Sequence, residues 1–153
     1  YEYTLAGESE LHPTFPVTHI SFYEADAFAR WSAARLATEF EWEHVAKQAT
    51  NEVGSTKTSF FHPRAATGNG VQQLLDECWQ WTTSSYAPYP GFRSLSGTLG
   101  EYNGKFMANQ MVLRGGSCVS PEGHVRNTYR NFFYAKDRWQ FTGIRLVRNG
   151  AKL

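Results

Sequence analysis

Cysteine is scarce in this sequence, with only Cys78 and Cys118 among 153 residues. Two cysteines are too few for a disulfide framework and too few for a zinc site built from thiolates. Free cysteine is also one of the side chains most often found buried. We therefore expect two small buried thiols in a reducing compartment rather than a bridge.

Charge is also sparse, at 19% of residues with a formal net charge of +1, and the basic residues are dispersed. Such a chain has no field that would hold a polyanion, which argues against nucleic acid and anionic membrane as partners. The apolar runs are far too short to cross a bilayer. The sequence starts at Tyr1 without a basic and then apolar leader, so we expect a cytoplasmic protein.

Histidine clusters are missing as well. The five histidines are His12, His19, His44, His62 and His124, and none is followed by another four residues later. A non-haem Fe(II) site normally needs two or three clustered histidine or carboxylate ligands. The spacing therefore predicts no metal site in this chain, and His19 and His124 are expected to be hydrogen-bonded structural groups.

The first third carries the helix signals. A short strand is expected at 17–20, and Ser21 to Glu24 reads as a capping box that opens a helix reaching about Arg35. A second box, Thr38 to Glu41, opens a helix in which apolar residues recur at helical spacing to Ala49. At this length we expect one domain over 1–153.

The rest of the chain favours short strands and long loops. Residues 51–70 are rich in small polar residues and are expected to be irregular, followed by a short element at 74–81. Prolines interrupt regular structure at 86–92, and strands are expected at 111–113 and 141–147 with a partly irregular segment between them. This order predicts an α+β fold with two early helices and short antiparallel strands.

Aromatic and arginine residues are plentiful in contrast. Aromatic residues make up 16% of the chain, including five Trp, of which Trp79 and Trp81 are expected in the core. The arginines of the last third cannot all be core, so they must pair, stack or face a ligand. For Arg114 and Arg145 we expect structural ion pairs with Glu or Asp of the early helices.

Three segments of the last third are similar to one family. Arg114-Gly115-Gly116-Ser117, Arg126 to Phe133, and Gly143-Ile144-Arg145-Leu146 resemble the end of the formylglycine-generating-enzyme/sulfatase-modifying-factor domain, a variant of the C-type-lectin-like fold. Residues 35–43 match a further family segment except at Ala37. The motif at 76–82 departs from the family, since its glycine and asparagine are gone, and we predict no metal there.

The branch that generates formylglycine is disfavoured. Those enzymes resemble one another in two cysteines placed after Arg-Gly-Gly-Ser, where they form a thiolate copper site. Ser120 and Val125 stand at these positions here, and Cys118 alone cannot replace a paired thiolate site. Sulfatase-activating oxidation is therefore the less favoured alternative.

A second branch resembles the chain more fully, from Pro16 onward. The segments 86–92, 100–107, 109–118, 128–133 and 138–146 look like the C-terminal domain of ergothioneine-type sulfoxide synthases, the hercynine oxygenase family. The resemblance implies a substrate-binding domain of an iron-dependent oxidoreductase that joins cysteine, or a cysteinyl peptide, to hercynine. In that family Fe(II) lies in an N-terminal helical-bundle domain with a His-x-x-x-His-x-Glu pattern, which this chain lacks.

The resemblance also implies where substrates bind. Asn131, Phe132 and Phe133 should point into the cleft, with Tyr89 and Phe92 completing an aromatic cage for a trimethylammonium group. Substrate carboxylates would be clamped by three arginines, Arg126, Arg130 and Arg138. We assign no catalytic residue and no metal ligand, so the chain is expected to be inactive alone and to need an iron-binding domain in cis or in trans.

One further alternative remains open. A C-type-lectin-like scaffold also presents variable ligand surfaces, and fold does not dictate function. The chain is then a non-catalytic ligand-binding module, which exposed rings without a convergent cleft would favour.

Overall fold

The computed structural model describes residues 1–49, 61–121 and 123–150. Within these residues the fold mixes three helices with a four-stranded sheet and two two-stranded pairs, which confirms the α+β expectation at that level. The expectation of irregular structure at 51–70 is met over 61–70, and its first part lies outside the described residues. None of the described helices is both long enough and apolar enough to cross a membrane.

Helix α1 spans Phe22–Trp31 and begins as its capping box predicts. The Glu24 backbone N–H donates to Ser21 Oγ at 3.2 Å, and the Ser21 backbone N–H donates to a Glu24 carboxylate oxygen at 2.8 Å. The predicted end near Arg35 is wrong, because Ala33 takes a φ of +51° and breaks the helical path. The next residues form strand β3, Arg35–Leu36, instead.

Helix α2 spans Glu39–Ala49 and confirms the second predicted helix. Thr38 Oγ1 accepts from the Glu41 backbone N–H at 3.2 Å, and Glu41 returns the bond to the Thr38 N–H at 2.8 Å. One face of α2, carrying Glu39, Trp42 and Ala46, is buried. These positions lie one turn and two turns apart, so a carboxylate shares the inward face with the apolar residues.

The main sheet has the order β6-β5-β4-β7. Its strands are β4 Trp79–Ser85, β5 Gln110–Arg114, β6 Asn131–Tyr134 and β7 Thr142–Gly143. β4, β5 and β6 pair antiparallel, but β7 pairs parallel with β4, which the expectation of antiparallel strands missed.

Two smaller pairs complete the sheet structure. β3 pairs antiparallel with β8, Leu146–Val147, and an N-terminal hairpin joins β1, Glu2–Thr4, to β2, Gly7–Ser9. The strand expected at 17–20 is absent, since His19 has a φ of +55° that breaks an extended run. The strand expected at 141–147 is divided into β7 and β8, each with its own partner.

The core lies between α1 and the centre of the main sheet. One cluster joins Ala25 and Ala29 of α1 to the buried residues Leu36, Trp79, Trp81 and Leu113. This confirms the expectation that both tryptophans are core residues. The indole N–H of Trp81 donates to the Ile20 carbonyl at 2.8 Å, so its burial leaves no unpaired donor.

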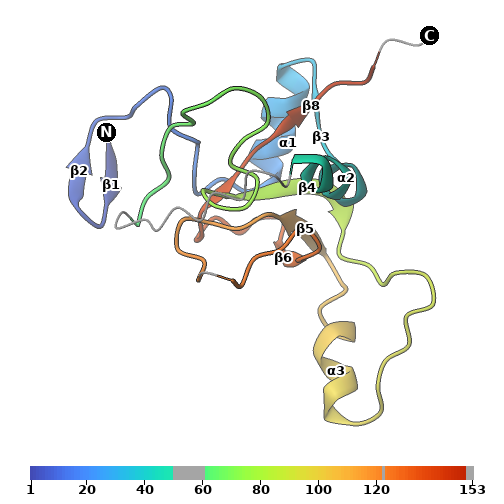
Figure 1. The fold of residues 1–153 in the computed structure, drawn as a ribbon. Helices are drawn as coiled ribbons and strands as arrows, with labels where there is room; N and C mark the ends of the chain where they lie inside the picture. Colours follow the sequence, from blue (N-terminus) through green and yellow to red (C-terminus); the bar gives the residue numbers. More distant parts are fainter. Residues whose placement is uncertain (50–60, 122, 151–153) are drawn as a thin grey trace.

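A long excursion separates β4 from β5. Residues 86–109 leave the body of the protein after Ser85, run through the irregular proline segment, and carry helix α3, Thr98–Gly104, at their far end (Figure 1). We call these residues the arm. The irregular segment at 86–92 matches the sequence prediction, whereas α3 was not predicted.

Candidate functional site

The guanidinium of Arg130 lies between two tyrosine rings where the arm leaves the sheet. Its Cζ is 4.8 Å from the ring centroid of Tyr86 and 4.3 Å from that of Tyr89. Nε and one terminal nitrogen donate to the two oxygens of Glu39 at 2.8 and 2.9 Å, and the same terminal nitrogen donates to the Ala87 carbonyl at 3.1 Å. We call Glu39, Tyr86, Tyr89, Arg130 and Phe132 the arginine cage.

Helix α2 supplies the carboxylate of the cage from its first turn. Glu39 is 3% exposed and also faces Arg114, which is fully buried and binds Glu43 of the same helix. A buried charge needs a partner, and here two arginines of the last third are matched by two glutamates of α2. The prediction of structural ion pairs with the early helices is confirmed for Arg114.

Phe132 attaches the cage to the arm. Its ring stacks on Tyr86 at 3.9 Å between centroids with 12° between planes, and it contacts Phe106 at 5.9 Å. The Tyr86 hydroxyl donates to Asn103 Oδ1 at 3.4 Å. Burial raises the pKa of Tyr86 and of Tyr89, so both hydroxyls stay protonated at neutral pH and the Tyr89 O–H donates to Glu39 at 3.2 Å.

The neighbours of Phe132 on strand β6 point the other way, because side chains alternate along a strand. Phe133 packs on the main core and meets the Trp139 ring at 4.9 Å, edge to face. Asn131 Oδ1 accepts from the Phe132 backbone N–H at 2.9 Å, and within the described residues Asn131 Nδ2 donates to nothing. Arg138 lies on the α1 side, 62% exposed, and pairs with Glu24 at 3.3 Å.

The remaining predicted residues lie apart. Phe92 is 42% exposed in the arm, with its backbone N–H donating to the Tyr89 carbonyl at 3.0 Å. Arg126 is exposed and stacks over the Tyr129 ring at 5.4 Å. The eight predicted residues thus lie in the cage, on the opposite face of β6, in the arm at Phe92, beside α1 at Arg138 and at the separate Arg126 position, rather than in one cavity.

Sequence reasoning missed two members of the cage. Glu39 was interpreted only as part of a helix start, and Tyr86 only as part of the loop motif. A carboxylate at the same helical face as Trp42 and Ala46 is a usable signal, because it must be buried and therefore needs a cation. The abundance of arginine in the last third indicates where that cation comes from.

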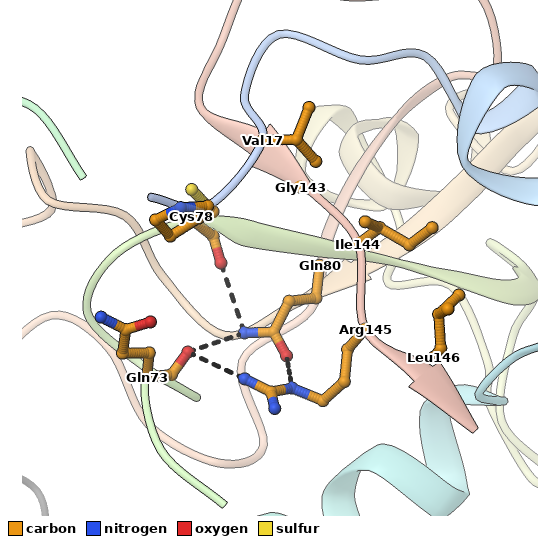
Figure 2. A pocket seen from close by; sticks show the side chains of 9 residues that line it. Val17, Gln73, Cys78, Gln80, Gly143, Ile144, Arg145 and Leu146 are labelled. Carbon is orange, nitrogen blue, oxygen red and sulfur yellow. Dashed lines mark hydrogen bonds between the residues drawn. The ribbon is translucent and has the colours of Figure 1, made fainter. Parts of the chain in front are cut away.

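The pocket drawn in Figure 2 lies elsewhere, between β4 and the segment that joins β7 to β8. It has a volume of about 330 Å³ and is lined by Pro16, Val17, Gln73, Cys78, Gln80, Gly143, Ile144, Arg145 and Leu146. Figure 2 shows the Gln80 amide and the Arg145 guanidinium converging on the Gln73 backbone. None of the eight predicted site residues lines it.

The polar side chains of Gln80 and Arg145 in this pocket form hydrogen bonds within the protein. Gln80 Oε1 accepts from Trp42 Nε1 at 2.7 Å and from Arg145 Nε at 2.8 Å, and a terminal nitrogen of Arg145 donates to the Gln72 carbonyl at 2.7 Å. Burial lowers the pKa of Arg145. The expected ion pair of Arg145 with an early helix is therefore wrong, since Gln80 and backbone carbonyls replace it.

The cysteines and histidines form no metal centre within the described residues. Burial raises the pKa of Cys118 to about 11 and that of Cys78 still further. Ser120 Oγ accepts from the Ser117 N–H at 3.0 Å, and Val125 packs on the core. His124 meets the Tyr129 hydroxyl at 3.1 Å, as expected of a structural histidine.

Comparison with known proteins gives a family match over most of the chain. Residues 5–62 and 49–150 match the sulfatase-modifying factor enzyme 1-like domain. The chain is 31% identical to hercynine oxygenase of Mycolicibacterium smegmatis over 86% of its own length and 37% of that protein.

Two further relatives are more distant. Formylglycine-generating enzyme of Streptomyces coelicolor is 26% identical, with 77% of this chain and 46% of that protein covered. Ergothioneine biosynthesis protein 1 of Schizosaccharomyces pombe is 26% identical, with 84% of this chain and 18% of that protein covered. The chain thus spans less than half the length of each of these relatives.

Proposed function

The chain belongs to the family of sulfatase-modifying factor enzyme 1-like domains, and from that premise we propose that it is the substrate-binding part of a non-haem iron-dependent sulfoxide synthase. The reaction forms a carbon–sulfur bond between hercynine and cysteine or a cysteinyl peptide. The names of the relatives, hercynine oxygenase and ergothioneine biosynthesis protein, support this assignment. The proposal includes a C-type-lectin-like scaffold and a cytoplasmic location.

The proposal depends most on the hydrogen bonding of the Asn131 side-chain amide. The Phe132 N–H holds Oδ1, which orients the amide, and Nδ2 has no acceptor within the described residues. The side chain is half-buried on the edge strand β6. An oriented donor without a protein partner suits a substrate acceptor, either an imidazole nitrogen or a carboxylate oxygen.

The rings of Tyr89, Phe92 and Phe132 supply a surface for the quaternary ammonium group of hercynine. Tyr89 is 41% exposed and Phe92 is 42% exposed, and the Arg130 guanidinium already lies against Tyr89. A cation over an aromatic face gains about 0.5–2 kcal/mol, depending on how far it is desolvated. In this proposal Tyr89, Phe92 and Phe132 meet the trimethylammonium group, and Asn131 reaches the rest of the substrate around the edge strand β6, while Phe133 stays packed on the core.

The arginines differ in their availability for a substrate carboxylate. Arg130 is already bound through two nitrogens to Glu39, so it acts as a clamp only if that pair opens. Arg126 makes no ion pair with a described carboxylate, and Arg138 holds Glu24 only at the exposed surface. We therefore place the carboxylate contact at Arg126 or Arg138, and give Arg130 the task of positioning Tyr89.

Iron does not fit the described residues, which bring no three His, Cys, Asp or Glu side chains together. The proposed role of this chain therefore contains no step at a metal. The proposal assigns Fe(II) to another domain, in cis or in trans, and assigns to this chain the binding and orientation of hercynine and the sulfur donor.

A comparison of hercynine with histidine tests the proposed ring surface. Both are titrated calorimetrically into the chain mixed with an iron-bearing partner domain. Hercynine should bind about tenfold more tightly than histidine because only it carries the quaternary ammonium group, and Tyr89→Ala should remove the difference. Equal affinities for the two compounds in the unmodified chain would reject this role of the rings.

The non-catalytic binding module remains a second candidate. The predicted residues do not converge on one cavity, and Trp139 and Tyr134 are 68% and 49% exposed. Exposed rings spread over the last third suit a surface that binds ligand without catalysis. Hercynine binding that produces no carbon–sulfur product in the complete enzyme would favour this candidate.

A further inference from the structure

Arg145 is the one charged residue among those that line the pocket of Figure 2. The other lining residues of the described chain are neutral, and they include no Asp, Glu or Lys. With a volume of about 330 Å³ the pocket is large enough for a small molecule, since ligand sites begin at about 300 Å³. A cavity of this size with a single cationic side chain suits a small anion.

The positive charge of Arg145 has no direct counterion in the described part of the chain. Its hydrogen bonds go to the Gln80 side chain and to the carbonyls of Gln72 and Gln73. The charge of Asp76 acts on it, but the two side chains form no ion pair. The Arg145 side chain is half-buried, and a buried cation without a partner is costly. An anion that binds beside it would offset part of this cost.

One nitrogen of the Arg145 guanidinium is left to bind a ligand. Nε donates to Gln80 Oε1 at 2.8 Å and Nη2 donates to the Gln72 carbonyl at 2.7 Å, as two of the three nitrogens in Figure 2 indicate by their dashed lines. Among the described residues Nη1 has no acceptor.

The orientation of this free donor is fixed by Gln80. Gln80 is 4% exposed, and its amide nitrogen donates to the Leu74 carbonyl at 3.0 Å while its oxygen accepts from Arg145. The side-chain amide is therefore held at both ends. A donor that is oriented before a ligand arrives loses less conformational entropy on binding.

We propose that this pocket binds a small monocarboxylate, with one carboxylate oxygen accepting a hydrogen bond from Arg145 Nη1. One free nitrogen suits a carboxylate better than a phosphate, which carries more charge and more oxygens than a single donor can satisfy. Val17, Ile144 and Leu146 also line the pocket, so a short carbon chain suits the rest of the cavity. The site goes beyond the proposed function and does not depend on it, because no residue assigned to hercynine lines the pocket.

Propionate and propionamide test the site, because they have nearly the same size and shape and only propionate is charged. Each is titrated into the chain without hercynine, at an ionic strength kept constant with sodium chloride, while amide NMR spectra follow residues 143–146. The dissociation constant of propionate should be at least about tenfold smaller than that of propionamide. Equal affinities, or no saturable change with propionate, would overturn the proposal.

Two arginine variants test the assigned residue. Arg145→Gln removes the charge, and Arg148→Gln makes the same change at an exposed position three residues later. Removal of a half-buried charge without an ion pair also removes a desolvation cost, so Arg145→Gln should fold. It should bind propionate at least about tenfold more weakly, and Arg148→Gln should match the unmodified chain.

Equal propionate affinity in Arg145→Gln and the unmodified chain would overturn the assignment, as would equal weakening in the two variants. If Arg145→Gln does not fold, the comparison of propionate with propionamide in the unmodified chain still decides the proposal. Because no hercynine is present, failure at this pocket is distinguishable from failure of hercynine binding.

Discussion

Glu39 and Arg130 form a two-nitrogen ion pair between the first turn of α2 and the residue just before β6, with bonds of 2.8 and 2.9 Å. The side chains are 3% and 14% exposed. The pair joins the helical first third of the chain to the arginine-rich last third. It also holds Arg130 against Tyr86 and Tyr89, so the fold and the candidate site depend on the same contact.

Removal of Glu39 should therefore be costly. Glu39→Ala leaves the buried positive charge of Arg130 without its carboxylate partner and removes a second carboxylate from near Arg114. Breaking a buried ion pair in this way should lower the free energy of unfolding by about 3 kcal/mol. Urea denaturation measures this loss. Arg30→Ala, which breaks the exposed pair with Asp26 at 2.8 Å, is the control and should stay within about 0.5 kcal/mol. Equal losses in the two variants would show that the pair does not hold the fold.

Stability should fall in acid partly through Glu41. Hydrogen bonds from Arg35 and from Thr38 lower the pKa of this carboxyl from 4.5 to about 2. A depressed pKa in the folded state gives stability that is present above 4.5 and is lost as the pH falls toward 2. Urea midpoints across this range should fall less in Glu41→Gln and in Arg35→Gln than in the unmodified chain. Equal falls of the urea midpoint with pH in all three proteins would contradict a contribution of Glu41 to the acid sensitivity.

Gly116 should not tolerate a side chain. A Cβ there would overlap the Leu75 carbonyl oxygen and lie 2.8 Å from a methyl carbon of Val125. Gly116→Ala should cost about 1–3 kcal/mol in unfolding free energy, measured by thermal or urea melts. The control Gly104→Ala meets nothing nearer than 3.8 Å in α3 and should be neutral or stabilising by up to about 1 kcal/mol. A neutral Gly116→Ala would show that the Arg-Gly-Gly turn has room to relax.

Both thiols should react slowly in the native protein. Cys78 and Cys118 are buried, and their raised pKa values leave little thiolate near pH 8. Iodoacetamide should modify them much faster in urea than in buffer, as followed by mass spectrometry. Fast native modification of Cys118 would indicate an activated thiol and would revive the sulfatase-oxidising alternative.

The elements that the sequence predicted well depend on local contacts. Ser21 with Glu24 and Thr38 with Glu41 start their helices through bonds across three residues, which are visible in the sequence itself. The predicted end of α1 was wrong because the left-handed backbone conformation that ends it falls on Ala33 and not on a glycine, which the sequence would have shown. The parallel pairing of β4 with β7 joins Trp79 to Thr142, and no local pattern specifies such a partner.

In the candidate site, too, the sequence predicted some residues and could not predict others. The motif Asn131-Phe132-Phe133 could be found by resemblance, and strand alternation explains why its rings face opposite sides of β6. The partner of Arg130 could not be found locally, because Glu39 lies 91 residues earlier. Whether Arg130 reaches a substrate depends on this competing carboxylate, which only the folded chain brings close.

Binding of hercynine by the Asn131 donor is tested most directly by calorimetric titration of hercynine into the complete iron-bearing enzyme. Asn131→Asp keeps the acceptor for the Phe132 N–H but removes the Nδ2 donor, while Asn69→Asp makes the same change in an exposed loop. We expect the dissociation constant of hercynine to be at least about tenfold larger for Asn131→Asp and unchanged for Asn69→Asp. Equal hercynine affinity in Asn131→Asp and the unmodified enzyme would contradict it.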